Sequence, residues 1–289
     1  MTQPILALQD VTYTYPDGSP GLHQCSLAIP RGSRTAILGC NGSGKTTLCL
    51  HLNGLLRPQA GTVWFNGQPL DYRRQSLKAL RSQVGLVFQN PDNQLLSASV
   101  WEDVSFGPMN LGLPRSIVAA RVEQALAAVG LATLADKPVH NLSFGQKKRV
   151  CLAGILAMQP EVIILDEPFA GLDVPMQQEL QAILTDLWQQ GRTVVLCSHD
   201  LDFAYEWADQ WQILVAGRVA TTLAITQIPS ALSELAAYGL GPPKVALLYQ
   251  ELLASGLLPP VPTPPRSHTE LLTLLRTSGQ RSRRQGQRA

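Results

Sequence analysis

The stretch Gly39–Thr46, GCNGSGKT, decides the fold of this chain. It matches the pattern G-x-x-x-x-G-K-[ST], in which glycines let the backbone wrap around a phosphate and successive N–H groups point at its oxygens. The apolar run Thr35–Leu38 before it is predicted to be a buried strand, and a helix is predicted to begin near Gly44. A chance glycine-rich turn is the alternative, but the strand–loop–helix context favours a binding site for the phosphates of a nucleotide.

Several residues of this phosphate loop are candidates for contact with a nucleotide. Lys45 is predicted to bring positive charge to the β- and γ-phosphates, and the Thr46 hydroxyl is predicted to bind a Mg²⁺ ion. The backbone of the loop and the start of the helix complete the site. The predicted nucleotide-binding residues here are Asn41, Gly42, Ser43, Gly44, Lys45, Thr46 and Thr47.

A pair of acids follows a second apolar run. Val162–Leu165 is predicted to be a buried strand, and Asp166 and Glu167 come directly after it. A strand end beside the phosphate loop would place Asp166 near Mg²⁺ through a bound water, and Glu167 beside an attacking water whose proton it accepts. Two solvated acids are the alternative for the pair alone. Together with the phosphate loop, the pair predicts phosphoryl transfer to water.

Strands and helices alternate through most of the chain. Residues 5–38 contain short apolar runs separated by turn signals, which favours an antiparallel, hairpin-rich start. Further buried strands are predicted at residues 84–88, 162–165 and 193–196, and helices at 115–129, 175–190 and 200–208. This alternation indicates a parallel sheet covered on both faces, so the predicted fold class is α/β.

The composition argues against a membrane-spanning or disulfide-linked chain. Of the 289 residues 45% are apolar, yet no run of about 18 apolar residues occurs, so any membrane role is expected to come through a partner. No basic segment leads an apolar stretch at the N-terminus, so no signal peptide is expected. The odd number of cysteines, none with metal-ligand spacing, predicts a reduced, cytosolic chain that itself binds no transition metal. They are Cys25, Cys40, Cys49, Cys151 and Cys197.

The pattern changes after residue 222. Two apolar helices are predicted near residues 243–255 and 268–276, joined by the proline-rich stretch Leu258–Pro265. Because no chemistry-bearing motif falls there, the segment is interpreted as a packing, dimer-holding or regulatory appendage. The last residues carry five arginines and no acid, and this basic tail is predicted to be disordered. The predicted parts are a nucleotide-binding domain, 1–222, a helical extension, 223–275, and the tail, 276–289.

The stretch Asn141–Gln146, NLSFGQ, resembles the signature sequence of the ABC ATPase family. Other parts of the family pattern follow in the family's order across residues 3–222. The resemblance implies that Tyr15 stacks on adenine, that Gln89 senses Mg²⁺ and the attacking water, and that His199 grips the γ-phosphate. It also implies ATP contacts across a dimer seam for Ser143, Gly145, Gln146 and Asp173.

The family implies a fold and a mechanism. The fold is a RecA-like P-loop NTPase core with an antiparallel β subdomain and an α-helical signature subdomain. Two subunits would sandwich two ATP molecules head to tail, and closure and reopening of the dimer would drive a membrane partner. The implied catalytic residues are Glu167, His199 and Gln89, and the implied Mg²⁺ ligands are Thr46, Gln89 and Asp166.

Two positions depart from the family pattern. Phe144 replaces the first glycine of the commonest signature, while Ser143 and Gly145 remain, so contact with the γ-phosphate is expected to survive. Phe169 stands where threonine is common after Glu167-Pro168. Because this position borders the site, we expect an effect on rate and not on mechanism.

Three further stretches, residues 88–94, 106–113 and 142–150, are similar to the ATPases of energy-coupling factor transporters, which import vitamins and metals into prokaryotes. Residues 154–160 and the short extension are most similar to the cobalt/nickel branch. The resemblance implies an ATPase for cobalt or nickel import at the cytoplasmic face of the cell membrane. Its implied partners are a second ATPase subunit, identical or related, an integral membrane coupling subunit and a substrate-binding membrane subunit.

Two alternatives remain at this point. One is an ATPase for vitamin uptake through the same class of transporter. The other is a soluble ABC protein that acts on ribosomes or DNA. A single cassette in which Ser143 comes only 98 positions after Lys45, with no heptad run, disfavours the second alternative. Arginines without interleaved aromatic residues are a weak nucleic-acid signal, so no nucleic-acid partner is expected.

Overall fold

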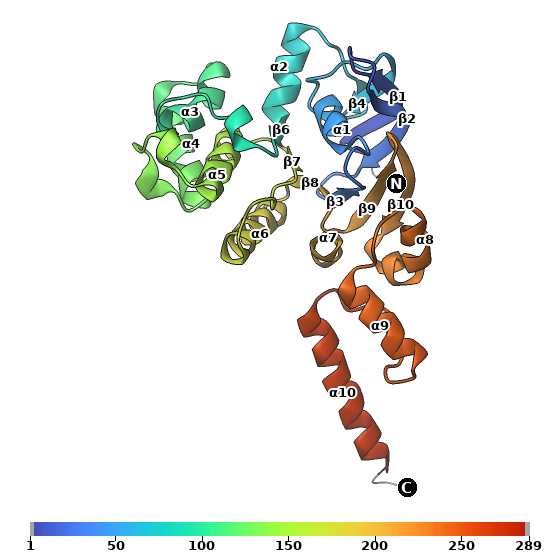
Figure 1. The fold of residues 1–289 in the computed structure, drawn as a ribbon. Helices are drawn as coiled ribbons and strands as arrows, with labels where there is room; N and C mark the ends of the chain where they lie inside the picture. The colour runs from blue at the N-terminus through green and yellow to red at the C-terminus, as the bar shows by residue number, and fades with distance from the viewer. Residues whose placement is uncertain (1–2, 287–289) are drawn as a thin grey trace.

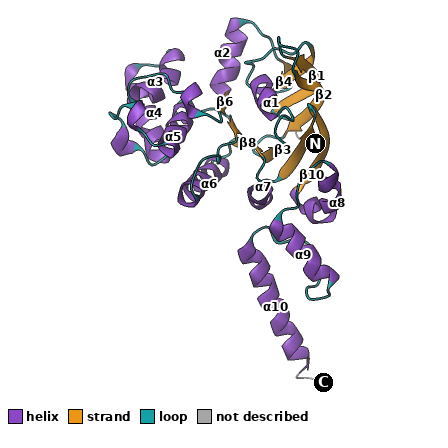
Figure 2. Ribbon diagram, viewed as in Figure 1, coloured by secondary structure: helices purple, strands orange, loops and turns teal. Residues whose placement is uncertain are grey.

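Two β-sheets organise the chain (Figures 1 and 2). The computed structural model describes residues 3–286, with side chains described as far as residue 278. The first sheet is antiparallel and has the order β2-β1-β4-β5, which confirms the hairpin-rich start. Its strands are β1 (Leu6–Thr14), β2 (Pro20–Ile29), β4 (Ala60–Phe65) and β5 (Gln68–Pro69).

The second sheet carries the phosphate loop. Its order is β10-β9-β3-β8-β7-β6, and every neighbouring pair is parallel except the edge pair β10 and β9. Because the carboxyl ends of the parallel strands meet at one edge, the loops that follow β3, β6, β7 and β8 lie together there. The strands are β3 (Arg34–Leu38), β6 (Val84–Val87), β7 (Val162–Asp166), β8 (Thr193–Ser198), β9 (Gln210–Val215) and β10 (Arg218–Ala224).

Both faces of this sheet are covered, which is why its central strands are mostly apolar and buried. Along β7, Val162 and Ile164 belong to the core shared with the antiparallel sheet, α1 and α2, whereas Ile163 and Leu165 belong to the core shared with the other helices. This alternation follows from the two-residue period of a strand. The covering helices are α1 (Lys45–Leu52), α2 (Arg74–Gln83), α6 (Val174–Gln189) and α7 (Leu201–Trp207).

A lobe of helices stands beside the sheets, at the left of Figure 1. The N-terminus of α3 is fixed by a capping box, in which Ser99 and Glu102 each bond the other's backbone N–H. The predicted helix at 115–129 is confirmed as α4. The elements of the lobe are η1 (Pro91–Asn93), α3 (Val100–Asn110), α4 (Arg115–Ala128), η2 (Ala132–Leu134), η3 (Val139–Asn141) and α5 (Phe144–Leu156).

The C-terminal extension is anchored to the core. Ile228 and Leu235 are fully buried in the larger of the two hydrophobic clusters, and Tyr205 donates a hydrogen bond from its hydroxyl to the Pro265 carbonyl at 3.1 Å. The two predicted helices are confirmed, and two more elements precede them that the sequence did not predict. The extension comprises η4 (Ile225–Ala231), α8 (Leu232–Ala237), α9 (Lys244–Ala254) and α10 (His268–Gly286).

Two predicted boundaries fall inside elements of the structure. The boundary at 222/223 lies within β10, and the boundary at 275/276 lies within α10. The basic segment predicted to be disordered from residue 276 onward continues α10 as far as Gly286. Arginine and glutamine are good helix formers, so the helix extends past its apolar part. The end of the predicted tail, residues 287–289, lies outside the described residues.

Candidate nucleotide-binding site

The phosphate loop connects β3 to α1 and needs glycine at particular positions. A Cβ at Gly39 would come within 2.3 Å of the Leu214 carbonyl oxygen and 2.6 Å of Ser43 Oγ. Gly44, the residue before α1, has φ of 103°, and Gly42 has φ of 78°, a region that side chains with a Cβ rarely adopt. The loop conformation therefore depends on the glycines that defined the sequence motif.

Lys45 is held inside the loop. Its side chain is only 7% exposed, and Nζ donates hydrogen bonds to the carbonyl oxygens of Gly39 at 2.7 Å and Cys40 at 3.3 Å. The same Nζ lies 3.7 Å from Oε1 of Glu167. Among the described residues, the buried hydroxyl of Ser43 has no hydrogen-bond partner. The loop thus gathers one ammonium group and a free donor where the motif predicts phosphate oxygens.

Thr46 and Asp166 form a second contact at the same sheet edge. Thr46 Oγ1 donates to Asp166 Oδ2 at 2.7 Å, while Asp166 Oδ1 is buried without a partner in the described part of the chain. Burial raises the pKa of Asp166, and the Thr46 hydrogen bond opposes that rise. A hydroxyl and a carboxylate with an unpaired oxygen fit Mg²⁺, which prefers hard oxygen ligands and retains several waters.

Glu167 lies between Lys45 and His199. Its Oε2 is 2.9 Å from Nδ1 of His199, and the backbone of Glu167 has φ of 46°. The parallel pairing of β7 and β8, with Asp166 opposite Cys197, brings the two ends of these strands side by side. A positive φ outside glycine is uncommon and clusters at functional sites. This backbone turn directs the carboxylate towards the phosphate loop.

Tyr15 and Thr47 lie together beside the loop. The Tyr15 hydroxyl and Thr47 Oγ1 are 3.0 Å apart, and the Tyr15 ring meets the Tyr13 ring edge-on at 5.1 Å between centroids. The ring is partly exposed, as a stacking surface requires. Asn41 is exposed in the loop. Gln89 is exposed two residues beyond the end of β6, at the same edge of the sheet as Asp166.

The signature residues lie in the helical lobe. Ser143 and Gln146 form a capping box at the start of α5, with each side chain accepting the other's backbone N–H. A Cβ at Gly145 would come within 2.4 Å of Met176 Sδ, so this glycine allows α5 to approach α6. Asp173 caps α6 by accepting from the Met176 N–H at 3.0 Å. Within one chain these residues therefore have structural roles.

A buried lysine that the sequence did not identify connects α5 to the loop after Glu167. Lys148 is only 5% exposed, and its Nζ donates to three carbonyl oxygens, those of Glu167 at 3.0 Å, Pro168 at 2.8 Å and Ala170 at 2.8 Å. Burial lowers its pKa to about 8. No sequence signal marked it, because a lysine in a polar helical stretch is ordinarily solvated.

The two phenylalanines that depart from the family pattern both pack in this region. Nζ of Lys148 lies 5.3 Å from the centroid of the Phe144 ring, and a Cβ at Gly171 would come within 2.9 Å of that ring. Phe144 thus covers the lysine and the loop that it holds. Phe169 is buried with its ring 4.3 Å from that of Phe203. Phe169 therefore packs into the core behind the predicted site.

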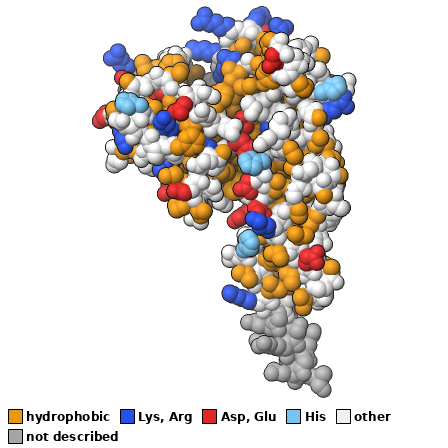
Figure 3. All heavy atoms as spheres, in the orientation of Figure 1, with side chains coloured by type: hydrophobic (Ala, Val, Ile, Leu, Met, Phe, Trp, Pro, Cys, Tyr) orange, Lys and Arg blue, Asp and Glu red, His pale blue; other side chains and the backbone are white. Residues whose placement is uncertain are grey.

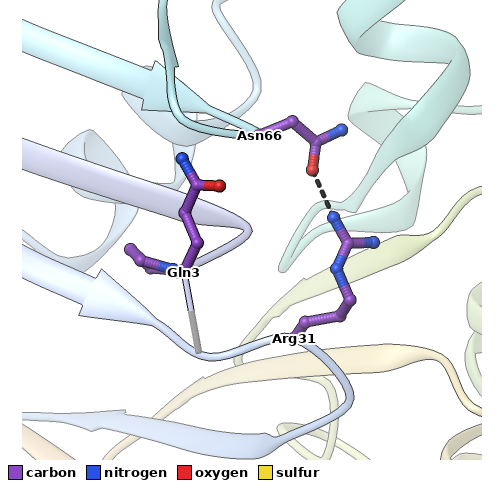
Figure 4. A pocket seen from close by; sticks show the side chains of 4 residues that line it. Gln3, Arg31 and Asn66 are labelled. Atoms are coloured by element: carbon purple, nitrogen blue, oxygen red, sulfur yellow. Dashed lines mark hydrogen bonds between the residues drawn. The ribbon is translucent and has the colours of Figure 1, made fainter. Parts of the chain in front are cut away.

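A separate pocket of about 410 Å³ lies at the edge of the antiparallel sheet (Figure 4). Gln3, Pro4, Arg31 and Asn66 line it, and Arg31 hydrogen-bonds to Asn66 and forms an ion pair with Glu161. The Arg31 cation is therefore already paired. None of the predicted site residues lines this pocket, and its lining offers no nucleophile or acid for chemistry.

The loop, the two acids and the histidine define a P-loop nucleotide hydrolase. The family model described as ABC transporter matches residues 22–170. The cobalt import ATP-binding protein CbiO of Rhodobacter capsulatus is 48% identical over 84% of this chain and 86% of that protein. The energy-coupling factor transporter ATP-binding protein EcfA of Methanocaldococcus jannaschii is 44% identical over 86% of this chain and 89% of its own length. The chain belongs to the ABC transporter family and is an ATP-binding, ATP-hydrolysing cassette.

Solved structures agree with this assignment. CbiO1 of Clostridium perfringens, described as part of the transporter complex CbiONQ, superimposes with a TM-score of 0.72 at 41% identity and covers 85% of this chain and 98% of its own. The cassette MJ0796, solved as a dimer with ADP and phosphate, superimposes with a TM-score of 0.70 at 27% identity, over 76% of this chain and 98% of its own. Among the described residues, no helix is long and apolar enough to span a bilayer.

Proposed function

We propose that the chain is the ATPase subunit of an energy-coupling factor importer and that the transported substrate is cobalt. The observation that carries the ATPase role is the joint arrangement of Lys45, Thr46–Asp166 and Glu167–His199 at one sheet edge. Similarity to CbiO over most of both chains supports cobalt, and similarity to EcfA supports the transporter class. Vitamin uptake through the same class of transporter is the second candidate, because several similar proteins are described only as energy-coupling factor ATPases.

Each residue of the candidate site has a separate proposed role in ATP hydrolysis. Lys45 would exchange its two carbonyl acceptors for β- and γ-phosphate oxygens. Thr46, Asp166 and Gln89 would hold Mg²⁺, which when bound neutralises charge on the phosphates. Glu167 would accept the proton of the attacking water, and His199, hydrogen-bonded to Glu167, would orient the carboxylate and reach the γ-phosphate.

We propose a composite site that two subunits build together. Tyr15 and the loop residues Asn41–Thr47 of one subunit would hold ATP, and Ser143, Gly145 and Gln146 of the other would cover it. The exposed ends of α5 and α6 suit this role, because Ser143 and Asp173 present their backbone caps at the protein surface. A dimer, of two copies or with a related ATPase, is then needed for turnover.

A surface on the helical lobe suits docking to the membrane subunit (Figure 3). It exposes apolar side chains around α3, with Leu96 78%, Met109 57% and Phe106 55% exposed. Phe106 and Met109 are three residues apart on α3 and therefore share one face of the helix, and exposed apolar faces mark interaction sites. Asp92 precedes Leu96 by four residues and pairs with Lys147 at 2.7 Å. We propose that a cytoplasmic helix of the integral membrane coupling subunit binds here.

Reconstitution tests the transported substrate. The chain would be co-purified from its native membrane with its membrane subunits, which would be identified and placed in vesicles. The proposal expects ATP-dependent accumulation of radioactive Co²⁺, lost in vesicles made with Glu167→Gln. Uptake of a vitamin with no uptake of Co²⁺ or Ni²⁺ would replace cobalt with the second candidate. Recovery of the chain without membrane subunits would contradict the transport proposal.

A further inference from the structure

Two cysteines that lie far apart in the sequence meet behind the phosphate loop. Cys49 on α1 and Cys197 on β8 are separated by 148 positions, yet their sulfur atoms are 3.0 Å apart and fully buried. Both are free thiols. The spacing of cysteines along the sequence predicted no metal ligands, because only the packing of α1 against β8 brings these two together.

A carboxylate completes a group of three potential ligands. One oxygen of Asp166 and the two sulfur atoms all lie within 4.8 Å of one another, and all three residues are buried. Asp166 is 3% exposed, and its Oδ1 has no hydrogen-bond partner among the described residues. An unpaired buried carboxylate oxygen is costly unless something binds it. Packing alone accounts for two buried thiols but not for the unpaired oxygen of the neighbouring carboxylate.

We propose that Cys49, Cys197 and Asp166 bind a thiophilic divalent transition-metal ion such as Zn²⁺ or Co²⁺, and that this ion inhibits ATP hydrolysis by occupying Asp166. Two sulfur ligands and one carboxylate are a donor set for borderline ions of this kind, whereas Mg²⁺ and Ca²⁺ prefer oxygen alone. A water can fill the fourth position of a tetrahedral site.

The geometry needs only a small adjustment. A metal–sulfur bond of about 2.3 Å in a tetrahedral site separates two sulfur atoms by about 3.8 Å, so the thiols would part by roughly 0.8 Å. Without a metal, the hydrogen bond to Cys197 and burial hold the pKa of Cys49 well above its usual value, so the Cys49 thiol is protonated. Metal binding releases the two thiol protons to solvent.

Inhibition follows because Asp166 would be a ligand both of the proposed ion and of Mg²⁺. The same carboxylate accepts from Thr46 at 2.7 Å and is the proposed partner of Mg²⁺ in hydrolysis. An ion bound by the two sulfur atoms would also bind the carboxylate of Asp166. The carboxylate would then be unable to bind the Mg²⁺ that accompanies ATP. This inhibitory step rests on the proposed role of Asp166, whereas binding of the metal does not. In a cobalt importer, cobalt that has accumulated would therefore slow the ATPase that drives its import.

Cobalt absorption spectroscopy tests the binding. The purified full-length chain, reduced and under anaerobic conditions without nucleotide, would be titrated with CoCl₂. We expect a thiolate-to-cobalt charge-transfer band in the near ultraviolet that saturates at one ion per chain. Cys49→Ser and Cys197→Ser should each weaken binding by at least roughly ten-fold, as the loss of even an outer-shell partner does. Cys25→Ser is the matched control, because Cys25 is also a fully buried free thiol but lies in β2.

A band that is absent in the wild type, or unchanged in both variants, would overturn the site. Cys49→Ala and Cys197→Ala provide second variants if the serine variants fold poorly, as judged by circular dichroism. ATP hydrolysis tests the inhibitory step separately. Added Co²⁺ should inhibit the wild type at low Mg²⁺, high Mg²⁺ should relieve the inhibition, and Cys49→Ser should resist it. A band without selective inhibition would retain the metal site and remove its effect through Asp166.

Discussion

The imidazole of His199 lies 2.9 Å from the carboxylate of Glu167, although the two residues end different strands. If Glu167 accepts the proton of the attacking water, Glu167→Gln should bind ATP normally and lower kcat by about 10²–10⁴-fold. The variant should also accumulate as an ATP-stabilised dimer, visible by size-exclusion chromatography. Lys45→Ala is the contrasting variant, which should lose ATP affinity and form no such dimer. Turnover near the wild-type rate in Glu167→Gln would remove Glu167 from the chemistry.

Mixing two inactive chains tests the composite site. A heterodimer of Lys45→Ala and Ser143→Arg places both defects in one site and leaves the other intact. If one intact site suffices for hydrolysis, equal mixing should restore about a quarter of wild-type activity, because half of the random dimers carry one working site. ATPase assays on mixtures of increasing ratio measure this recovery. Normal hydrolysis by the pure Ser143→Arg homodimer would contradict a composite site.

Lys148 should affect turnover more than ATP affinity. Lys148→Gln loses donors to the loop that carries Glu167, so we expect kcat to fall roughly ten- to hundred-fold with little change in KM. Lys147→Gln is the control, because Lys147 is the neighbouring lysine and pairs with Asp92 on the surface instead. An unchanged kcat in Lys148→Gln would show that the lysine serves folding alone.

The same lysine predicts a pH dependence. Its pKa is lowered to about 8 by burial, so the ammonium form, with three N–H donors for three carbonyls, dominates below that pH. The neutral amine above it has only two donors. We expect kcat of the wild type to fall as pH rises through about 8. Lys148→Gln should lack this step, and an identical step in the variant would assign it to another group.

The C-terminal extension should contribute to the stability of the whole chain. Leu235 on α8 is fully buried in the larger core cluster, so Leu235→Ala should lower the free energy of unfolding by about 2–5 kcal/mol. Leu247→Ala on α9, where the side chain is 41% exposed, is the control and should change it by less than about 0.5 kcal/mol. Urea unfolding measures both. Equal, small effects would show that the extension unfolds independently.

Asp92→Arg tests the docking surface. It reverses a charge that is 59% exposed and replaces the ion pair with Lys147 by repulsion. ATPase activity of the isolated subunit should stay within a few-fold of wild type, while assembly with the membrane subunit and uptake in vesicles should fall sharply. Glu179→Arg is a matched control, because Glu179 is 57% exposed and pairs with Arg149, which lies on α5 as Lys147 does. If both variants assemble equally well, Asp92 lies outside the docking surface.

The parts of the structure that the sequence could predict are those that depend on local sequence patterns. The phosphate loop, β7 with its two acids, and the α/β alternation are all set by neighbours along the chain, so they were predictable. The turn after β6 was less predictable, because Asn90 accepts the hydrogen bond from the Asp92 N–H while Asp92 pairs with Lys147, which lies 55 positions further along the chain.

Features that depend on distant segments were not predictable. Cys49 and Cys197 become neighbours only through the order of strands in the sheet, and the three acceptors of Lys148 lie on a loop 19 to 22 residues away. The elements η4 and α8 have short, weakly periodic sequences, and their burial against the core stabilises them more than their own propensity does. Tertiary packing, not local preference, decided each of these.

The attachment of Lys148 has a consequence for how ATP hydrolysis would be coordinated between two subunits. Helix α5 begins at the signature residue Ser143, which in the proposed dimer faces the partner's ATP, and its Lys148 holds the loop that carries the chain's own Glu167. The start of α5 would contact the nucleotide bound by the partner, and Lys148 on the same helix holds the loop of the chain's own site. A movement at one site would therefore be transmitted through α5 to the other site. Loss of phosphate from one site would then loosen the catalytic loop of the other site, so the two hydrolysis events would be coupled and not independent.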